Sequence, residues 1–341
     1  MSEKSPSSSK DKSASAFERM WHYRPDVPVK TAPYFTLYPS LWQMVIWTYR
    51  QWLYVTERAL LLVISMISFL YFQPELAVMT ELEFGWIAGL WVRNMALMVG
   101  VAGLLHLYFY TKRAQDDSLR YDDRDLADQQ AQFTFGNQLA DNIFWTLASG
   151  VSIWTAYEVL LFWAMANGFA PVMAFADHKI LFIVMIFATP IWISFHFYWV
   201  HRLMHWGPLY RISHALHHRN NNVGPWSGLS MHPIEHVIFF SSIVIHFIIP
   251  SSPFHILFHM QHQSLTAATS HTGYEAVLIR DKKYLALGTF HHQMHHRYFD
   301  CNYGNLEMPW DKWFGSFHDG TQASHEAFKL RKKRLRQKFM L

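Results

Sequence analysis

Three short segments between residues 201 and 296 carry eight histidines: His201-Arg-Leu-Met-His205, His214-Ala-Leu-His217-His218 and His292-Gln-Met-His295-His296. Residues three and four apart share a face of a helix, so each segment is expected to point its histidines in one direction. Three converging faces would gather eight imidazoles around one volume. That number is too large for a single tetrahedral ion and suits two metal ions that keep an open coordination position.

The repetition of the spacing is what carries this prediction. A single histidine is more often a surface or hydrogen-bonded core residue than a metal ligand. Here seventeen of the 22 histidines lie between His196 and His296, and the same spacing recurs three times. The single cysteine, Cys301, excludes a thiolate cluster and an internal disulfide, so the ligands are expected to be histidines with carboxylate or water.

The composition indicates a membrane protein. Of the 341 residues, 51% are hydrophobic and 16% are charged, against about 25% charged in soluble domains. The 15 tryptophans suit positions at membrane interfaces. A formal net charge of +4 is too small to indicate a nucleic-acid partner.

Four hydrophobic segments follow one another before the first histidine segment, at about 52–72, 84–110, 143–166 and 180–200. Each is near the ~20 residues that a spanning helix needs. Arg93, inside the second segment, is interpreted as structural because a charge within the bilayer usually faces protein. The sequence therefore predicts an all-α, polytopic membrane protein with about four transmembrane helices. The expected regions are an irregular or disordered tail at 1–40, transmembrane helices at 41–200, a catalytic region at 201–320 and a basic tail at 321–341.

Residues 237–265 form a further apolar stretch that is interrupted by Pro250 and Pro253. Each half is shorter than a full span, and the second and third histidine segments must meet on one side of the membrane. We therefore expect a re-entrant or short helical hairpin rather than one crossing.

The loop charges predict the orientation. Lys112 and Arg113 are basic, as is the region after His201, whereas the 73–83 loop holds three glutamates and no Lys or Arg. By the positive-inside rule, both termini and the histidine-rich region are expected on the cytosolic side.

Residues 1–16 are expected to be disordered. The basic run at 329–338 could contact anionic headgroups or be a solvated tail.

The three histidine segments, which follow hydrophobic segments, resemble the histidine boxes of the fatty acid hydroxylase/sterol desaturase superfamily of membrane di-iron enzymes. Other motifs of this sequence are similar to those of the superfamily too. These are Trp226-Ser-Gly-Leu-Ser-Met-His232-Pro-Ile-Glu235-His236, His271-Thr-Gly273, Asn302-Tyr303-Gly304 and Trp310-Asp311-Lys-Trp-Phe-Gly315. The resemblance covers about residues 140–320. The spacing of the first segment and the Asn-Tyr-Gly motif are more similar to the sterol desaturase side.

The resemblance implies two iron ions, dioxygen as co-substrate and electrons from a carrier protein such as cytochrome b5 or ferredoxin. It implies desaturation or hydroxylation of a lipid, with a sterol or sterol-like substrate first and a fatty acyl or sphingolipid substrate as the alternative. Both reactions begin with the same hydrogen abstraction, so both stay open. The membrane would be the endoplasmic reticulum in a eukaryote and the inner membrane in a bacterium.

The predicted metal ligands are the eight histidines of the three segments, to which the resemblance adds His271. Residues expected to orient the ligands or the substrate are His232, Glu235 and His236. Glu275 is a candidate carboxylate ligand or hydrogen-bond partner. Asn302 and Asp311 are assigned to packing and capping near the site.

Two other classes of function compete with this interpretation. His232-Pro-Ile-Glu235-His236 matches the H-x-x-E-H pattern of zinc hydrolases, with the glutamate as general base. That reading leaves the eight ordered histidines unexplained, and Pro233 would weaken the middle of a helix. A metal transporter could also line a membrane path with histidines, but here the histidine segments follow the predicted spans instead of lying within them.

Overall fold

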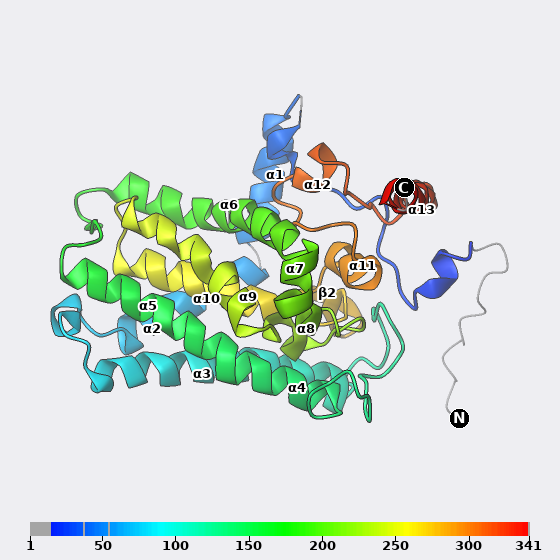
Figure 1. Cartoon of the computed structure of the whole chain (residues 1–341). Helices are drawn as coiled ribbons and strands as arrows, with labels where there is room; N and C mark the ends of the chain where they lie inside the picture. The colour runs from blue at the N-terminus through cyan, green and yellow to red at the C-terminus, as the bar shows by residue number, and fades with distance from the viewer. Residues whose placement is uncertain (1–14, 37, 54, 340–341) are drawn as a thin grey trace.

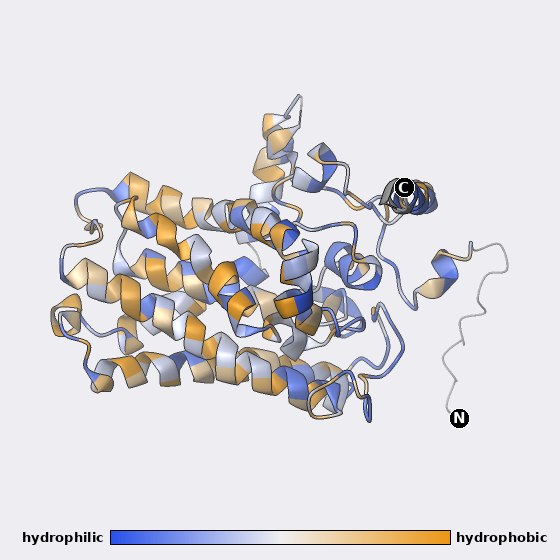
Figure 2. Cartoon of the chain, viewed as in Figure 1, coloured by the Kyte–Doolittle hydropathy of each residue, from blue (hydrophilic) through white to orange (hydrophobic). Residues whose placement is uncertain are grey.

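The computed structural model describes residues 15–36, 38–53 and 55–339. The predicted disordered tail at 1–16 lies almost wholly outside these residues. The described chain is mostly helical, and Figure 1 shows long helices along one half of the molecule and shorter elements at the other half. Hydrophobic residues dominate the long helices, and hydrophilic residues gather where the shorter elements lie (Figure 2).

Within the described residues, three helices are long and apolar enough to cross a membrane, or up to four if a bent pair forms one span. The three are α3 (Phe84–His106) continued by η4 (Leu107–Thr111), α4 (Gln138–Phe144) continued by η5 (Trp145–Val151) and α5 (Ser152–Ala166), and α6 (Lys179–Met204). The bent pair is α1 (Leu41–Trp52) and α2 (Glu57–Phe72), which meet at 51°. The expected membrane architecture is confirmed.

The outer faces of these helices are apolar. Phe84 is 85% exposed and Ile180 is 81% exposed. Large apolar patches of this kind are rarely left open to water and mark a lipid-facing or partner-facing surface. The faces that point inward pack around α10 (Pro253–Ser270), whose residues are almost all buried.

Arg93 has the structural role that the sequence predicts for a charge within a span. Its guanidinium pairs with the carboxylate of Glu158 on α5, and both side chains are buried. Asn94 donates to the same carboxylate at 2.8 Å, and Trp154 donates to its other oxygen at 2.9 Å. A buried charge is tolerated when it is paired and hydrogen-bonded, so this network ties α3 to α5.

Residues 233–270 turn back on themselves. The helices α9 (Pro233–Phe240) and η8 (Ser241–Phe247) lead into a short turn, and α10 then returns toward the histidine-rich end. Gly228, in η7 (Pro225–Leu229), lies so close to α10 that an added Cβ would be 2.0 Å from the Ala267 carbonyl oxygen. Only glycine permits this approach, which fixes the chain after the second histidine segment against the end of α10.

Most of the remaining elements are short, and several of them lie near the end of α6 that carries the first histidine segment. Beside them lies a two-stranded antiparallel hairpin that the all-α prediction did not include; its turn places Arg280 and Asp281 at positive φ. The helices and strands not yet bounded are η1 (Glu18–Met20), η2 (Pro33–Phe35), η3 (Leu76–Met79), α7 (Gly207–Leu209), η6 (Tyr210–His214), α8 (Ala215–His217), β1 (Ala276–Ile279), β2 (Lys282–Ala286), α11 (Phe290–Tyr298), α12 (Trp310–Trp313) and α13 (Gln322–Phe339).

Candidate metal centre

The three histidine segments lie on three different helical elements that converge at one end of the bundle. The first occupies the last turn of α6, where His201 is buried and His205 is the C-terminal cap residue. The second crosses from η6 into α8. The third lies in α11, which begins after Thr289, whose side chain accepts a hydrogen bond from the amide of His292. His271, the cap residue at the end of α10, joins them.

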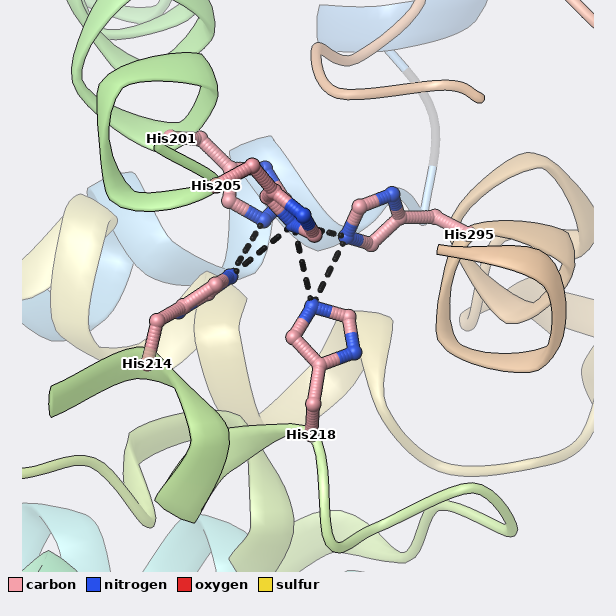
Figure 3. Close-up of side chains that lie close together, drawn as sticks. All are labelled: His201, His205, His214, His218 and His295. Carbon is pink, nitrogen blue, oxygen red and sulfur yellow. Dashed lines mark hydrogen bonds between the residues drawn. The ribbon is translucent and has the colours of Figure 1, made fainter. Parts of the chain in front are cut away.

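Five histidines form the first group: His201, His205, His214, His218 and His295. Figure 3 shows their rings pointing toward one another from α6, from the second segment and from α11. The Nε2 atom of His205 lies 3.1 Å from that of His214, 3.1 Å from that of His218 and 3.2 Å from that of His295. All five candidate ligand atoms lie within 4.8 Å of one another.

Four histidines form the second group: His217, His271, His292 and His296. All four are buried. The Nε2 atom of His292 lies 3.0 Å from that of His271 and 3.2 Å from that of His296. The nine histidines predicted as ligands are thus the same nine residues that make up the two groups.

The way the segments divide between the groups differs from the sequence expectation. The second segment was expected to point all its histidines in one direction, but His214 and His218 enter the five-histidine group and His217 enters the other. In the third segment, His292 and His296 both enter the four-histidine group, whereas His295 enters the five-histidine group. Residues four apart share a face most closely, whereas an adjacent residue is rotated by about 100°. Each of these two segments therefore serves both groups.

Hydrogen bonds at the outer ring nitrogens fix the protonation of several rings. The Nδ1 atom of His201 lies 2.6 Å from the Tyr303 carbonyl oxygen, that of His295 lies 2.7 Å from the Cys301 carbonyl and that of His271 lies 2.7 Å from the Ala267 carbonyl. A carbonyl only accepts, so Nδ1 must carry the proton, and a neutral imidazole then presents a lone pair at Nε2.

The Nε2 atoms of these three rings face Nε2 atoms of other histidines in the two groups. Nε2 atoms at 3.0–3.2 Å without hydrogens between them repel unless a cation lies among them. Two nitrogens each about 2.1 Å from one metal ion, at right angles, would be about 3.0 Å apart. The contacts therefore fit neighbouring ligands of one ion in each group, with angles nearer those of octahedral than of tetrahedral coordination. The residues present fit two metal ions.

Burial also keeps the rings in the form that binds metals. It lowers the pKa of His217 to about 4 and the pKa of His271 to about 3. Both rings are therefore neutral at pH 7, and a metal ion need not displace a proton from them.

Glu235 and His232, expected to orient ligands or substrate, have different partners. A carboxylate oxygen of Glu235 accepts a hydrogen bond from Nδ1 of His214 at 2.6 Å, and burial raises the pKa of this carboxyl well above its ordinary range. His232 instead accepts from the amide of Ile234 and caps α9. Only Glu235 therefore touches a predicted ligand directly.

His236 and Glu275 lie outside both groups. The Nδ1 atom of His236 is 2.9 Å from the Ser149 hydroxyl, and its Nε2 atom is 3.0 Å from the Leu229 carbonyl oxygen. The carboxylate of Glu275 accepts from the Tyr121 hydroxyl. The roles assigned to these two residues stay predictions. His232, Glu235 and His236 are not among the candidate metal groups of the described residues, so the zinc hydrolase motif has no assembled site there.

The loop after α11 holds the ligands in place. Asp311 accepts from the amides of Tyr303 and Gly304 at 2.9 and 2.8 Å, and Asn302 donates to the His291 carbonyl at 3.0 Å. These bonds position the Tyr303 carbonyl that orients His201. These orienting carbonyls could not be predicted, because every residue has a backbone carbonyl and the sequence does not show which of them will face a ring.

A cavity of about 710 Å³ opens beside the histidines. His217, His271 and His292 of the four-histidine group line it, together with His201 and His214. The walls nearby include Ile193, Phe197, Val200, Met204, Ile238 and Phe239. The cavity continues to the bend between α1 and α2. Its size and apolar walls suit a lipid-sized ligand beside the predicted metal ions.

Residues 184–316 match the family described as Fatty acid hydroxylase. Over 143 residues the chain is 29% identical to a Delta(7)-sterol 5(6)-desaturase of Eremothecium gossypii, which covers 40% of this chain and 37% of that protein. A Delta(7)-sterol-C5(6)-desaturase of Nicotiana tabacum is 29% identical over 141 residues, covering 38% and 48% respectively. The Delta(7)-sterol 5(6)-desaturase of Saccharomyces cerevisiae is 32% identical over 125 residues, covering 35% and 32%.

The chain therefore spans less than half of the length of each of these relatives. No solved structure matches it significantly.

Proposed function

We propose that this chain, whose residues 184–316 belong to the fatty acid hydroxylase family, is a membrane di-iron oxidoreductase that uses dioxygen to desaturate or hydroxylate a lipid. The observation that carries the proposal is the pair of histidine groups, with lone pairs converging at 3.0–3.2 Å beside an apolar cavity. Two irons fit the nine imidazoles. A sterol or sterol-like lipid is the proposed substrate, supported by the similarity to sterol desaturases.

The residues of this chain have distinct parts in such a reaction. The five-histidine and four-histidine groups would each hold one iron. Bound iron and dioxygen supply the oxidant for an unactivated C–H bond, which protein side chains cannot cleave. Glu235 and the Tyr303, Cys301 and Ala267 carbonyls fix the orientation of the rings. Phe197 and Phe239 make the neighbouring wall apolar, which excludes water from the C–H bond.

A fatty acyl or sphingolipid hydroxylase is the second candidate, since the matching family is described by fatty acid hydroxylation. For either substrate we propose a reduced carrier of the cytochrome b5 or ferredoxin type as electron donor. We also propose that the site and both termini are cytosolic, because the basic residues Lys112, Arg113 and Arg202 lie at the same helix ends as the histidines and the acidic 73–83 loop lies at the other.

The test compares lipids from cells with and without the chain, grown under ¹⁸O₂. Desaturation yields a lipid that has lost two hydrogens, and hydroxylation yields one that has gained a single ¹⁸O atom. His178→Ala is a matched control, because His178 is exposed and belongs to neither group. An unchanged lipid profile, in cells that supply iron and a reductant, would contradict the proposal.

A further inference from the structure

The cavity has a charged wall that the proposed metal chemistry does not use. At the bend between α1 and α2, Glu57 and Arg58 line the cavity, and Glu307 joins them from the loop after α11. Charged groups inside a membrane protein are costly and usually mark a binding function. These three residues are called here the polar wall.

The polar wall is held by contacts between three parts of the chain. Arg58 forms an ion pair with Glu307, and their side chains are 12% and 15% exposed. One carboxylate oxygen of Glu57 accepts a hydrogen bond from the hydroxyl of Thr269 on α10. Thr269 lies two residues before His271, which is about 3 Å along the helix axis. The polar wall is therefore level with the metal ligands along α10.

The charges of the polar wall do not balance. Arg58 is neutralised by its pairing with Glu307, so the carboxyl group of Glu57 has no cation of its own within the wall. A partly buried carboxylate is stabilised by a hydrogen-bond donor and destabilised by a second anion. The cavity is also lined by Arg50 and Lys283, but both are exposed, where water and salt screen their charges.

The same cavity offers further uncharged hydrogen-bonding groups. His262 and Thr266, four residues apart on one face of α10, line it, and both ring nitrogens of His262 and the hydroxyl of Thr266 have no hydrogen-bond partner among the described residues. His262 is 5% exposed. Buried polar groups of this kind are normally satisfied, which favours a ligand that brings a neutral polar group into the cavity.

We propose that the polar wall binds the hydroxyl head of a lipid alcohol, which donates its hydrogen to Glu57, and that it rejects lipids with a carboxylate or phosphate head. This inference rests on the proposed function, because it takes the cavity to be the place of the substrate. It names the substrate class as lipid alcohols, and it makes Glu57 the residue that discriminates an alcohol from the matching acid.

The test measures binding of two matched pairs of probes to the purified full chain. Cholesterol is compared with cholestane, which lacks the hydroxyl, and hexadecanol is compared with hexadecanoate. A hydrogen bond to a charged group is worth about 1.5–3 kcal/mol, so each alcohol should bind about tenfold or more tightly than its partner. Comparison of the two alcohols, cholesterol and hexadecanol, then shows whether the cavity prefers a sterol alcohol or a long-chain alcohol.

Glu57→Gln should remove most of this preference, since the amide keeps the shape of the side chain but loses the charge, and binding of hexadecanoate should become tighter. Glu307→Gln gives a second reading, because it leaves Arg58 without its carboxylate and should shift the preference toward hexadecanoate. Glu75→Gln, at an exposed loop position, is the matched control and should bind all four probes as the wild type does.

Two results would overturn the inference: tighter binding of hexadecanoate than of hexadecanol by the wild type, or an unchanged alcohol preference in both Glu57→Gln and Glu307→Gln. Because binding is measured without turnover, it separates this inference from the proposed function. Alcohol-selective binding by a protein that holds no iron would support the proposed role of the polar wall and contradict the proposed oxidoreductase activity.

Discussion

Two of the sets of buried histidines among the described residues differ in what their ring nitrogens face. In the two groups at the end of the bundle, Nε2 atoms face other Nε2 atoms at 3.0–3.2 Å, and the Nδ1 atoms of His201, His271 and His295 face carbonyl oxygens. These three rings point their lone pairs inward and have no hydrogen to share there.

The second set consists of His246 and His259, with Ser242 and Ser251 beside them. Nδ1 of His246 lies 2.6 Å from the Ser251 hydroxyl, its Nε2 atom lies 3.0 Å from Nδ1 of His259, and Nε2 of His259 lies 2.9 Å from the Ser242 hydroxyl. Each contact can pair one donor with one acceptor, so this row is satisfied without an ion. Burial and proximity of histidines therefore do not identify a metal site, whereas converging lone pairs do.

The largest expected effect comes from removing a ligand that faces other lone pairs. His295→Ala and His217→Ala remove one ligand from the five-histidine and four-histidine groups respectively. Each variant should lose iron from its own group and fall below detectable lipid oxidation, while the protein still inserts into membranes. Iron content per chain and product formation are the measurements. Full activity in both variants would refute the assignment of the two groups.

An intermediate effect is expected where an orienting partner is removed and the ligand stays. Glu235→Gln replaces the carboxylate that accepts from Nδ1 of His214. Loss of such a partner typically costs about 10–100-fold in metal affinity or activity. Titration of the metal-free variant with ferrous iron would measure the change. An affinity equal to that of the wild type would mean that this contact does not tune the site.

A smaller effect, of another kind, is expected in the satisfied row. His259→Ala removes one hydrogen-bond partner from Ser242 and one from His246, while Ser242 keeps Gln263 and His246 keeps Ser251. The loss should lower the free energy of unfolding by about 1–3 kcal/mol. The iron content should not change, because His259 faces no other lone pair. Thermal unfolding in detergent and metal analysis of the same sample test both statements. Loss of iron from the folded variant would contradict the claim that only the histidines with converging lone pairs hold the metal ions.

The smallest effect is expected at an exposed histidine. His178→Ala removes a surface ring at the start of α6 whose side chain forms no capping hydrogen bond there. Its free energy of unfolding should stay within about 0.5 kcal/mol of the wild type. A larger loss, measured as for His259→Ala, would show that histidine substitutions in this chain perturb stability regardless of their partners.

The sequence was sufficient for the membrane-spanning helices because long apolar segments are local signals. It did not predict the β1–β2 hairpin, since a run as short as Ala276–Ile279 has no periodicity to separate it from a loop or a helix end. The fourth apolar segment was expected at about 180–200, and α6 continues beyond it to Met204, so the first histidine segment is helical as its spacing predicts.

The nine candidate ligands could be named from spacing and resemblance, but their division into five and four could not. His217 and His218 are neighbours in the chain and enter different groups, which depends on how α8 is oriented against α11. The orienting carbonyls of Tyr303, Cys301 and Ala267 also could not be predicted, because they belong to the backbone and side-chain patterns do not reveal them. The polar wall brings together residues 57, 58 and 307, and only the fold joins positions so far apart.

The most direct test of the central claim is the metal content of the full-length protein purified in mild detergent, measured for iron and zinc together. Two irons per chain in the wild type, and a reduced content in His295→Ala, is the predicted result. One zinc per chain with no iron would contradict the claim that nine histidines form a di-iron centre, and would favour the zinc hydrolase interpretation of the His232-Pro-Ile-Glu235-His236 motif.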